Sequence, residues 1–273
     1  MRRMLLPTDL SDYSKIVLEF LDDFKLVGVE EVGVLFVIDT TKLSTVSGGF
    51  DPSAFIEAEE KRAREEIPKI VEKIESHGMK PIVHEFPTGN PVVEILRFSQ
   101  HYDFVVMGAR GRSLFKEILL GSISESVAMK ASVPVYVFKA KVVENEDKRV
   151  EKPCERLFER ILVAYDFSEH SRVALKYGVE IAEKTGGELV VLYVAEDDRN
   201  LEELRPELEG RNINFRLLTA RGSPARVIVE KQRELKASTI FLGSRGLGGI
   251  KALLGSVSDR VLRMSEVPVL VCR

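Results

Sequence analysis

Two glycine-rich segments have residue types and spacing suited to holding phosphate. The first reads Gly108-Ala109-Arg110-Gly111, followed by nine residues and then Gly121-Ser122. Glycine lets backbone N–H groups approach a ligand closely, and such groups can form a nest that binds an anion. A helix expected from about Ser122 to Ala131 would add the unpaired N–H groups of its first turn, where the helix dipole favours negative charge. We therefore interpret this segment as a phosphate cradle.

The same residues have a purely structural interpretation, namely a turn after a strand followed by a helix N-cap. The arrangement recurs in the second half of the chain, where Gly243-Ser244-Arg245-Gly246 and eight residues precede Gly255-Ser256. Its recurrence after the corresponding predicted strand favours phosphate binding in the first copy. The second copy is one residue shorter between its glycine pairs. This difference either shifts the helix N-terminus or is absorbed by the loop that contains Gly248-Gly249.

Both segments belong to a longer internal repeat. Asp9 and Asp166 lie 157 residues apart, whereas Gly121 and Gly255 lie 134 residues apart. The first copy therefore carries an insertion, which we place at about 39–80.

The insertion contains a helix-like, charge-rich run from Pro52 to His77. A second charged stretch, from Lys139 to Glu155, cannot bury much surface and is typical of a linker. We predict a first domain at 1–140, a linker at 141–156 and a second domain at 157–273.

Each copy alternates short runs rich in Val, Ile and Leu with helix-length segments. Such runs are expected of parallel strands buried on both faces. We predict an α/β fold of two tandem, doubly wound domains, each with five parallel strands whose carboxyl ends hold the ligand. The predicted strands are Met4–Leu6, Val32–Ile38, Pro81–Glu85, Phe104–Met107, Val133–Phe138, Arg160–Ala164, Glu188–Val194, Asn214–Leu218, Thr239–Leu242 and Val267–Cys272. The predicted helices include Ser168–Lys184, Pro224–Leu235 and Ser256–Met264.

The pattern G-x-x-G, nine residues, G-[S/T] resembles the fingerprint of the universal stress protein family, in its ATP-binding branch. The resemblance covers nearly the whole chain apart from the insertion and the linker, and tandem domains are common in that family. It implies an adenine-nucleotide alpha-hydrolase-like, Rossmann-like fold and a role in the cytoplasmic stress response. It further implies binding of ATP, ADP or AMP, with a divalent ion such as Mg²⁺ or Mn²⁺ bridging phosphate oxygens.

The same resemblance implies how the domains associate. The final strands, Val133–Phe138 and Val267–Cys272, would pair antiparallel, so that the two domains form a pseudo-dimer that mimics the family's usual dimer. Whole chains could then associate further as a homodimer.

By resemblance, the ends of the first two strands hold the adenosine, and the glycine motif holds the ribose and phosphates. The residues implied at the adenosine are Pro7, Thr8, Asp9 and Val37. Those implied at the ribose and phosphates are Gly108, Arg110, Gly111, Gly121, Ser122, Ile123 and Ser124. The second copy would use Asp166, Val194, Gly243, Gly246, Gly255, Ser256 and Val257. Capping the first helix of each copy is an alternative role for the two aspartates.

The bulk composition argues against several other classes of protein. The net charge of −3, from 40 basic and 43 acidic residues, predicts no footprint for nucleic acid. No apolar run approaches the roughly 18 residues of a membrane helix, so we expect a cytoplasmic protein. The four histidines lack metal-ligand spacing, so no metal site built from side chains is predicted.

Three functions fit the sequence. The first is a nucleotide-binding module with slow or no hydrolysis, because no general base stands beside the glycine motif. The second is an ATP-using enzyme, adenylate-forming or ATP-hydrolysing, which would need a substrate pocket built from the insertion at 39–80. The third is a partner-binding protein with one degenerate site, for which the shortened second motif is the best support.

Overall fold

Ten strands build the main sheet of this computed structural model, which describes residues 1–41, 51–109, 120–139, 141–144, 148–195, 199–246 and 255–273. The first half of the chain contributes β1 (Arg3–Pro7), β2 (Glu31–Leu35), β4 (Lys80–Val83), β6 (Phe104–Gly108) and β7 (Val135–Phe138). The second half contributes β10 (Arg160–Ala164), β11 (Glu188–Val194), β12 (Asn214–Ala220), β13 (Thr239–Gly243) and β14 (Val269–Cys272).

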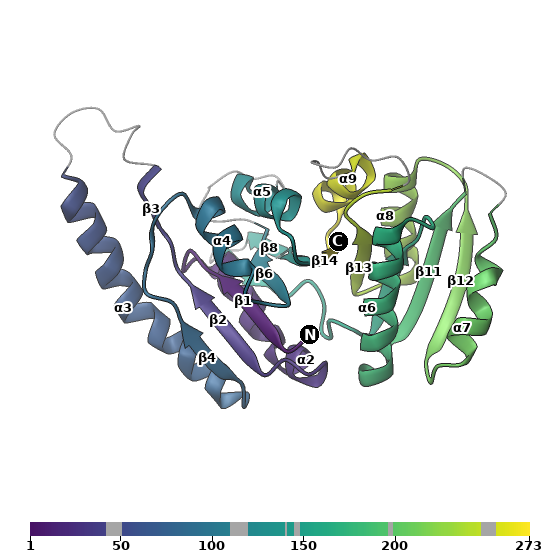
Figure 1. Cartoon of the computed structure of the whole chain (residues 1–273), viewed down its shortest axis with the longest axis horizontal. Coiled ribbons are helices and arrows are strands. Elements are labelled where there is room, and N and C mark those ends of the chain that lie inside the picture. Colours follow the sequence, from purple (N-terminus) through teal and green to yellow (C-terminus); the bar gives the residue numbers. More distant parts are fainter. Residues whose placement is uncertain (42–50, 110–119, 140, 145–147, 196–198, 247–254) are drawn as a thin grey trace.

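The strand order is β12-β11-β10-β13-β14-β7-β6-β1-β2-β4 (Figure 1). Within each half all neighbours are parallel, and the first strand lies between the second and the fourth. The order therefore reverses beside β1 in the first half and beside β10 in the second. The predicted α/β fold with two doubly wound, five-stranded halves is confirmed.

Buried side chains alternate between the two faces of the strands, as the pleat requires. In β1, Met4 and Leu6 join one hydrophobic cluster and Leu5 joins the other, so helices cover both faces of the sheet. Helices contributing to the first cluster are η1 (Ile16–Phe20), α2 (Leu21–Leu26), α3 (Pro52–Ser76), α6 (Glu169–Thr185), η3 (Leu201–Leu204) and α7 (Arg205–Glu209), and α1 (Asp12–Lys15) leads directly into η1. Those contributing to the second are α4 (Pro91–Ser99), α5 (Ser122–Lys130), α8 (Pro224–Leu235) and α9 (Ser256–Met264).

The two halves meet where β7 and β14 pair antiparallel, with Tyr136 opposite Leu270. This is the strand pairing that the resemblance implied. The fully buried Tyr136 places its hydroxyl 2.6 Å from Oγ1 of Thr239 in the other half. Helices α5 and α9 are joined across the same boundary by an ion pair between Glu125 and Arg263. The two halves therefore share one continuous sheet.

Proline sets two strand boundaries that differ from the prediction. Strands β7 and β14 begin just after Pro134 and Pro268 rather than before them, because proline has no N–H to donate to a neighbouring strand. The strand predicted to run to Ile38 ends at Leu35. The chain then forms a separate short strand, β3 (Ile38–Asp39), which pairs with β5 (Thr88–Gly89).

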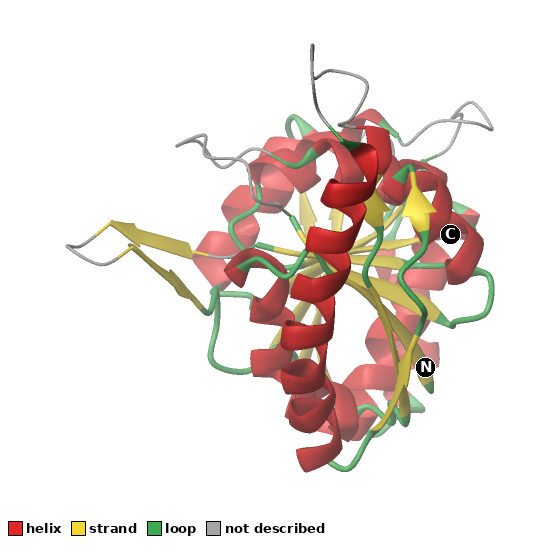
Figure 2. Cartoon of the chain, turned by 90° about the vertical axis from the view of Figure 1, so that its left-hand side faces the viewer, coloured by secondary structure: helices red, strands yellow, loops and turns green. Residues whose placement is uncertain are grey.

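The charged segment predicted as a linker contains a hairpin of β8 (Lys141–Glu144) and β9 (Lys148–Glu151). Figure 2 shows this hairpin projecting away from the body of the molecule. High charge indicates that a segment stays out of a core, but it does not distinguish an extended linker from a hairpin that pairs only with itself.

The insertion of the first half forms the long helix α3, within one residue of the predicted end. Asp51 caps the helix by accepting from the N–H of Ser53 at 2.9 Å, and Pro52 occupies the first turn. Its buried residues fall on one stripe that faces the first hydrophobic cluster, beside β2 and β4 at the edge of the sheet (Figure 1). These residues are Ala63, Ile67, Ile70 and Ile74. No helix of the described residues is long and apolar enough to cross a membrane.

Candidate functional site

Two equivalent sites lie at the carboxyl ends of the strands where the strand order reverses. In the first half, the N–H of Gly121 donates to the carbonyl of Ala109 at 2.7 Å, which places the start of α5 against the end of β6. In the second half, the N–H of Gly255 donates to the carbonyl of Ser244 at 2.7 Å in the same way. Parallel doubly wound sheets bind their ligands at this position.

The helices at these sites begin without a side-chain cap. Gly121 and Gly255 are the N-cap residues of α5 and α9, and among the described residues neither helix has a side-chain cap hydrogen bond at its start. By contrast, Ser11 and Ser168 cap α1 and α6 with their hydroxyls. The first-turn N–H groups of α5 and α9 can therefore serve a ligand, and the helix dipole makes an anion the favoured one.

The strand-end glycines of the motif, Gly108 and Gly243, are needed for space, whereas the glycines that precede the helices have ordinary backbone angles. The φ angles of Gly121 and Gly255 are −67° and −63°, which any residue adopts. A Cβ on Gly108 would lie 2.7 Å from the carbonyl oxygen of Tyr13. A Cβ on Gly243 would meet His170 at 2.8 Å. The strand-end glycines thus allow the first helix of each half to pack closely on the strand.

A turn built on an aspartate follows the first strand of each half. Oδ1 of Asp9 accepts from the N–H of Ser11 at 3.1 Å, and Oδ1 of Asp166 accepts from the N–H of Ser168 at 3.1 Å. The N-caps are these serines, so the alternative in which the aspartates cap the helices is wrong. The residue between each pair, Leu10 in the first half, has a positive φ of 63°. A left-handed backbone at a non-glycine residue costs about 1–2 kcal/mol and needs support from neighbouring groups.

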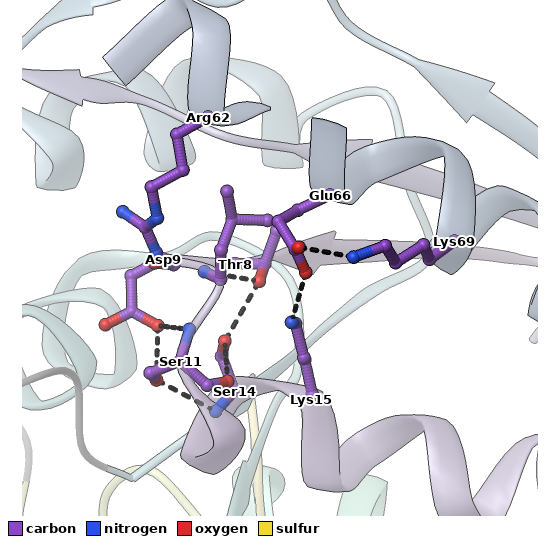
Figure 3. Close-up of polar contacts among 9 residues, drawn as sticks. Thr8, Asp9, Ser11, Ser14, Lys15, Arg62, Glu66 and Lys69 are labelled. Atoms are coloured by element: carbon purple, nitrogen blue, oxygen red, sulfur yellow. Dashed lines mark hydrogen bonds and ion pairs between the residues drawn. The ribbon is translucent and has the colours of Figure 1, made fainter. Parts of the chain in front are cut away.

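In the first half, Thr8 braces this turn (Figure 3). Its hydroxyl oxygen accepts from the N–H of Leu10 at 3.0 Å and lies 2.9 Å from Oγ of Ser14. Pro7 ends β1, and Val37 follows β2 and packs partly buried against the second hydrophobic cluster. The structure therefore places the predicted adenosine residues at the same edge of the sheet.

The Ser124 hydroxyl forms a buried hydrogen bond within the protein. Its side chain is 4% exposed, and its hydroxyl donates to the carbonyl of Gly108 at 2.7 Å. Ser258 makes the same contact with Gly243 at 2.7 Å. These serines hold α5 and α9 to the strand ends, while Ser122 and Ile123 lie in the first turn of α5. The predicted residues Arg110 and Gly111 lie outside the described residues.

The second half has a cavity of about 440 Å³ at its site. Pockets for small ligands commonly span about 300–1,000 Å³. Every residue predicted for the second copy lines this cavity, namely Asp166, Val194, Gly243, Gly246, Gly255, Ser256 and Val257. Its lining also includes aromatic and basic side chains that the sequence interpretation missed, which are Tyr165, Tyr193, Arg199 and Arg245. Arg245 corresponds to Arg110 in the repeat, and that correspondence could have identified it.

Arg245 lines the cavity, and the neighbouring Arg273 donates from Nη2 to the carbonyl of Ala128 at 2.7 Å. Burial, together with the nearby Arg245 guanidinium, lowers the pKa of Arg273 from its usual value. The Nε atoms of Arg245 and Arg273 are buried without a hydrogen-bond partner among the described residues. Two neighbouring guanidinium groups with unused donors favour an anionic ligand, because they repel each other when it is absent.

Helix α3 is tied to the first site by an ion-pair network (Figure 3). Glu66 lies 2.8 Å from Nζ of Lys15 on α1 and 2.6 Å from Nζ of Lys69. Hydrogen bonds from Lys15 and then Lys69 lower the pKa of Glu66 from 4.5 to about 2. In the unfolded chain the same carboxyl would take up its proton near its ordinary pKa.

We expect the Glu66 carboxyl to titrate near pH 2 in carbon-13 NMR spectra of the folded protein, because both lysines favour its charged form. The stabilisation from this pair is present above pH 4.5 and is lost as the pH falls toward 2. Lys15→Met should move the midpoint upward. Lys73→Met, which removes a partner of Glu19 instead, should not. A midpoint near 4.5 in the unmodified protein would show that the network does not form in solution.

Comparisons with known proteins agree over nearly the whole chain. A model of the universal stress protein family matches residues 1–139, 157–209 and 195–273. The crystal structure of a universal stress protein from Archaeoglobus fulgidus is 44% identical in sequence, with a TM-score of 0.82, and the match covers 99% of this chain and 98% of that one. A universal stress protein of Mycolicibacterium smegmatis is 28% identical over 268 residues, covering 89% of this chain and 87% of its own. One from Methanocaldococcus jannaschii is 31% identical over 156 residues, covering 51% of this chain and 96% of its own.

Proposed function

Because the chain belongs to the universal stress protein family and carries its domain in tandem, we propose that it binds ATP, ADP or AMP. The site in the first half lies at the carboxyl ends of β1 and β6. The site in the second half lies at the ends of β10 and β13. The bound nucleotide would serve a sensing role in the cytoplasmic stress response.

The cavity of the second half carries this proposal. Its lining includes three features that would suit an adenine nucleotide. Asp166 would approach the base, Gly246 leaves room beside that carboxylate, and the start of α9 at Gly255 and Ser256 would receive the phosphates. A Cβ on Gly246 would lie only 2.5 Å from Oδ2 of Asp166, so a larger residue would displace the aspartate.

The phosphates would be held by first-turn N–H groups of α9, and their charge would be balanced by Arg245, which lines the cavity. A divalent ion such as Mg²⁺ or Mn²⁺ would be held by phosphate oxygens. No group of three His, Cys, Asp or Glu side chains suited to a metal gathers among the described residues. Asp166 is the one carboxylate among the described residues that line the cavity, and it already accepts from Ser168. That lining therefore offers no further carboxylate to take a proton from an attacking water molecule, and we expect hydrolysis to be slow or absent.

The pairing of β7 with β14 supports a pseudo-dimer within one chain. We propose that this antiparallel contact takes the place of the contact between separate subunits in single-domain relatives. Each chain would then present two nucleotide sites in a fixed relation. The shortened motif of the second copy leaves all seven of its predicted residues around the cavity, so we propose that both halves bind nucleotide.

The direct test is to denature the purified protein and identify released ATP, ADP or AMP by mass spectrometry. The refolded, nucleotide-free protein should then bind ATP in isothermal titration with about two sites per chain. Finding no released nucleotide and no heat of binding would refute the proposal. Turnover on the order of 1–1,000 per second would instead favour an ATP-using enzyme.

A further inference from the structure

An arginine makes the same backbone contact at both sites. In the first half, the guanidinium of Arg62 donates to the carbonyl oxygen of Asp9 at 2.8 Å (Figure 3). In the second half, the guanidinium of Arg199 donates to the carbonyl oxygen of Asp166 at 3.1 Å. The acceptors are equivalent in the repeat, but the donors are not. Arg62 lies in helix α3 of the insertion, whereas Arg199 lies in the short segment between β11 and η3.

The contacted carbonyl belongs to the peptide that enters the strained residue of each turn. Leu10 and Phe167 directly follow the two aspartates and have φ angles of 63° and 65°. Lys236, at the end of α8, is the other described non-glycine residue with a positive φ. A charged donor on the preceding carbonyl fixes the orientation of this peptide and helps to offset the unfavourable backbone. This peptide belongs to the same turn as the N–H of Ser11 or Ser168 that the aspartate carboxylate accepts from.

Each arginine is itself held in place. Arg62 pairs with Glu59 at 3.2 Å, and its side chain is 25% exposed. Arg199 lies over the rings of Phe167 and Tyr193, with its guanidinium carbon 5.0 and 5.8 Å from the ring centres. Arg199 also lines the cavity of the second half. Cation–π contacts and ion pairs of this kind restrict the side chain and make its donors directional.

Anchoring of α3 does not account for the contact. That helix is already joined to the first half by the ion pairs of Lys15 with Glu66 and of Glu19 with Lys73. Arg199 makes the same contact although it lies outside the helices, just before η3. What the two halves share is the aspartate turn.

We propose that Arg62 and Arg199 are positioning residues of the two base pockets, and that the insertion helix completes the first pocket by supplying Arg62. Each arginine holds the aspartate turn so that the carboxylate faces the nucleobase. This assignment rests on the proposed nucleotide binding and deepens it, because it gives the insertion a role at the site.

The test compares ATP with inorganic tripolyphosphate, which shares the phosphates but lacks the base. We expect Arg62→Ala and Arg199→Ala each to weaken ATP binding at its own site by about tenfold and to leave tripolyphosphate binding unchanged. Arg62→Lys, which keeps a charged donor, should recover part of the loss. Two exposed arginines serve as matched controls, and Arg64→Ala on α3 and Arg211→Ala in the second half should change neither affinity. Equal weakening of both ligands, or of neither, would overturn the assignment.

Hydrogen exchange separates this inference from the proposed function. The amides of Leu10 and Ser11 are hydrogen-bonded within the first turn. Arg62→Ala should accelerate their exchange without affecting Ser168 in the second turn, and Arg199→Ala should do the reverse. If the unmodified protein bound no nucleotide, the proposed function would fail, and exchange would still decide whether the arginines hold the turns. Unchanged exchange in both variants would show that they do not.

Discussion

Gly255→Val should weaken ATP binding in the second half by about a hundredfold while the protein remains folded. The φ and ψ of Gly255, −63° and 147°, suit valine, and its Cβ would lie no closer than 3.4 Å to Arg245 and Ser244. The branched side chain would nevertheless cover the first-turn N–H groups of α9. Losing two hydrogen bonds to a charged phosphate, at about 1.5 kcal/mol each, corresponds to about a hundredfold in affinity. Isothermal titration should show the loss of one of two sites.

Two variants define the specificity of this effect. Gly121→Val should remove the other site, because Gly121 occupies the same position before α5. Gly210→Val is the matched control, since Gly210 has a similar φ of −70° and does not line the cavity. Full ATP affinity in Gly255→Val would mean that the start of α9 does not hold the phosphates. If Gly210→Val lowered ATP affinity by a similar factor, the effect would come from introducing valine and not from the position of Gly255.

Tyr136→Ala should lower the free energy of unfolding by about 4 kcal/mol, the middle of the range for removing a buried aromatic ring. Tyr136 is fully buried, and its ring lies 5.0 to 6.4 Å from those of Phe24, Phe138, Phe158 and Phe241. These partners come from both halves of the chain, so the ring fills space at the boundary between them. Urea denaturation followed by circular dichroism measures the change.

Tyr136→Phe isolates the hydroxyl from the ring. It keeps the packing and removes only the contact with Oγ1 of Thr239, which still donates to the carbonyl of Pro268 at 2.9 Å. The expected loss is about 1 kcal/mol, the usual net value of one hydrogen bond. If Tyr136→Ala cost no more than Tyr136→Phe, the ring would not be packed as the structure shows.

Local sequence patterns predicted most of the secondary structure. The helices predicted at Pro224–Leu235 and Ser256–Met264 match α8 and α9 at both ends. Their periodic apolar residues and their preceding glycine or serine are local signals that need no knowledge of the rest of the chain. The boundaries predicted beside Pro134 and Pro268 are among those that differ, and they concern strands whose limits depend on a neighbour's hydrogen bonds.

Local patterns also predicted one part of the candidate site and missed another. The glycine spacing and the aspartates are local motifs, and their recurrence in the repeat is enough to assign them to equivalent strand ends. The serine caps were missed because Asp9 and Ser11 are both suitable capping residues, and only the path of the turn selects the serine.

By itself the sequence determined the repeat and the doubly wound class of the fold, because both follow from local apolar patterns and glycine motifs that recur in the same order. The tertiary structure alone decided which residues contact the aspartate turns beside the glycine motifs. Arg62 reaches Asp9 across 53 residues and Arg199 reaches Asp166 across 33, from segments that do not correspond in the repeat. Such contacts depend on where α3 and the segment after β11 pack, and no local periodicity records that position.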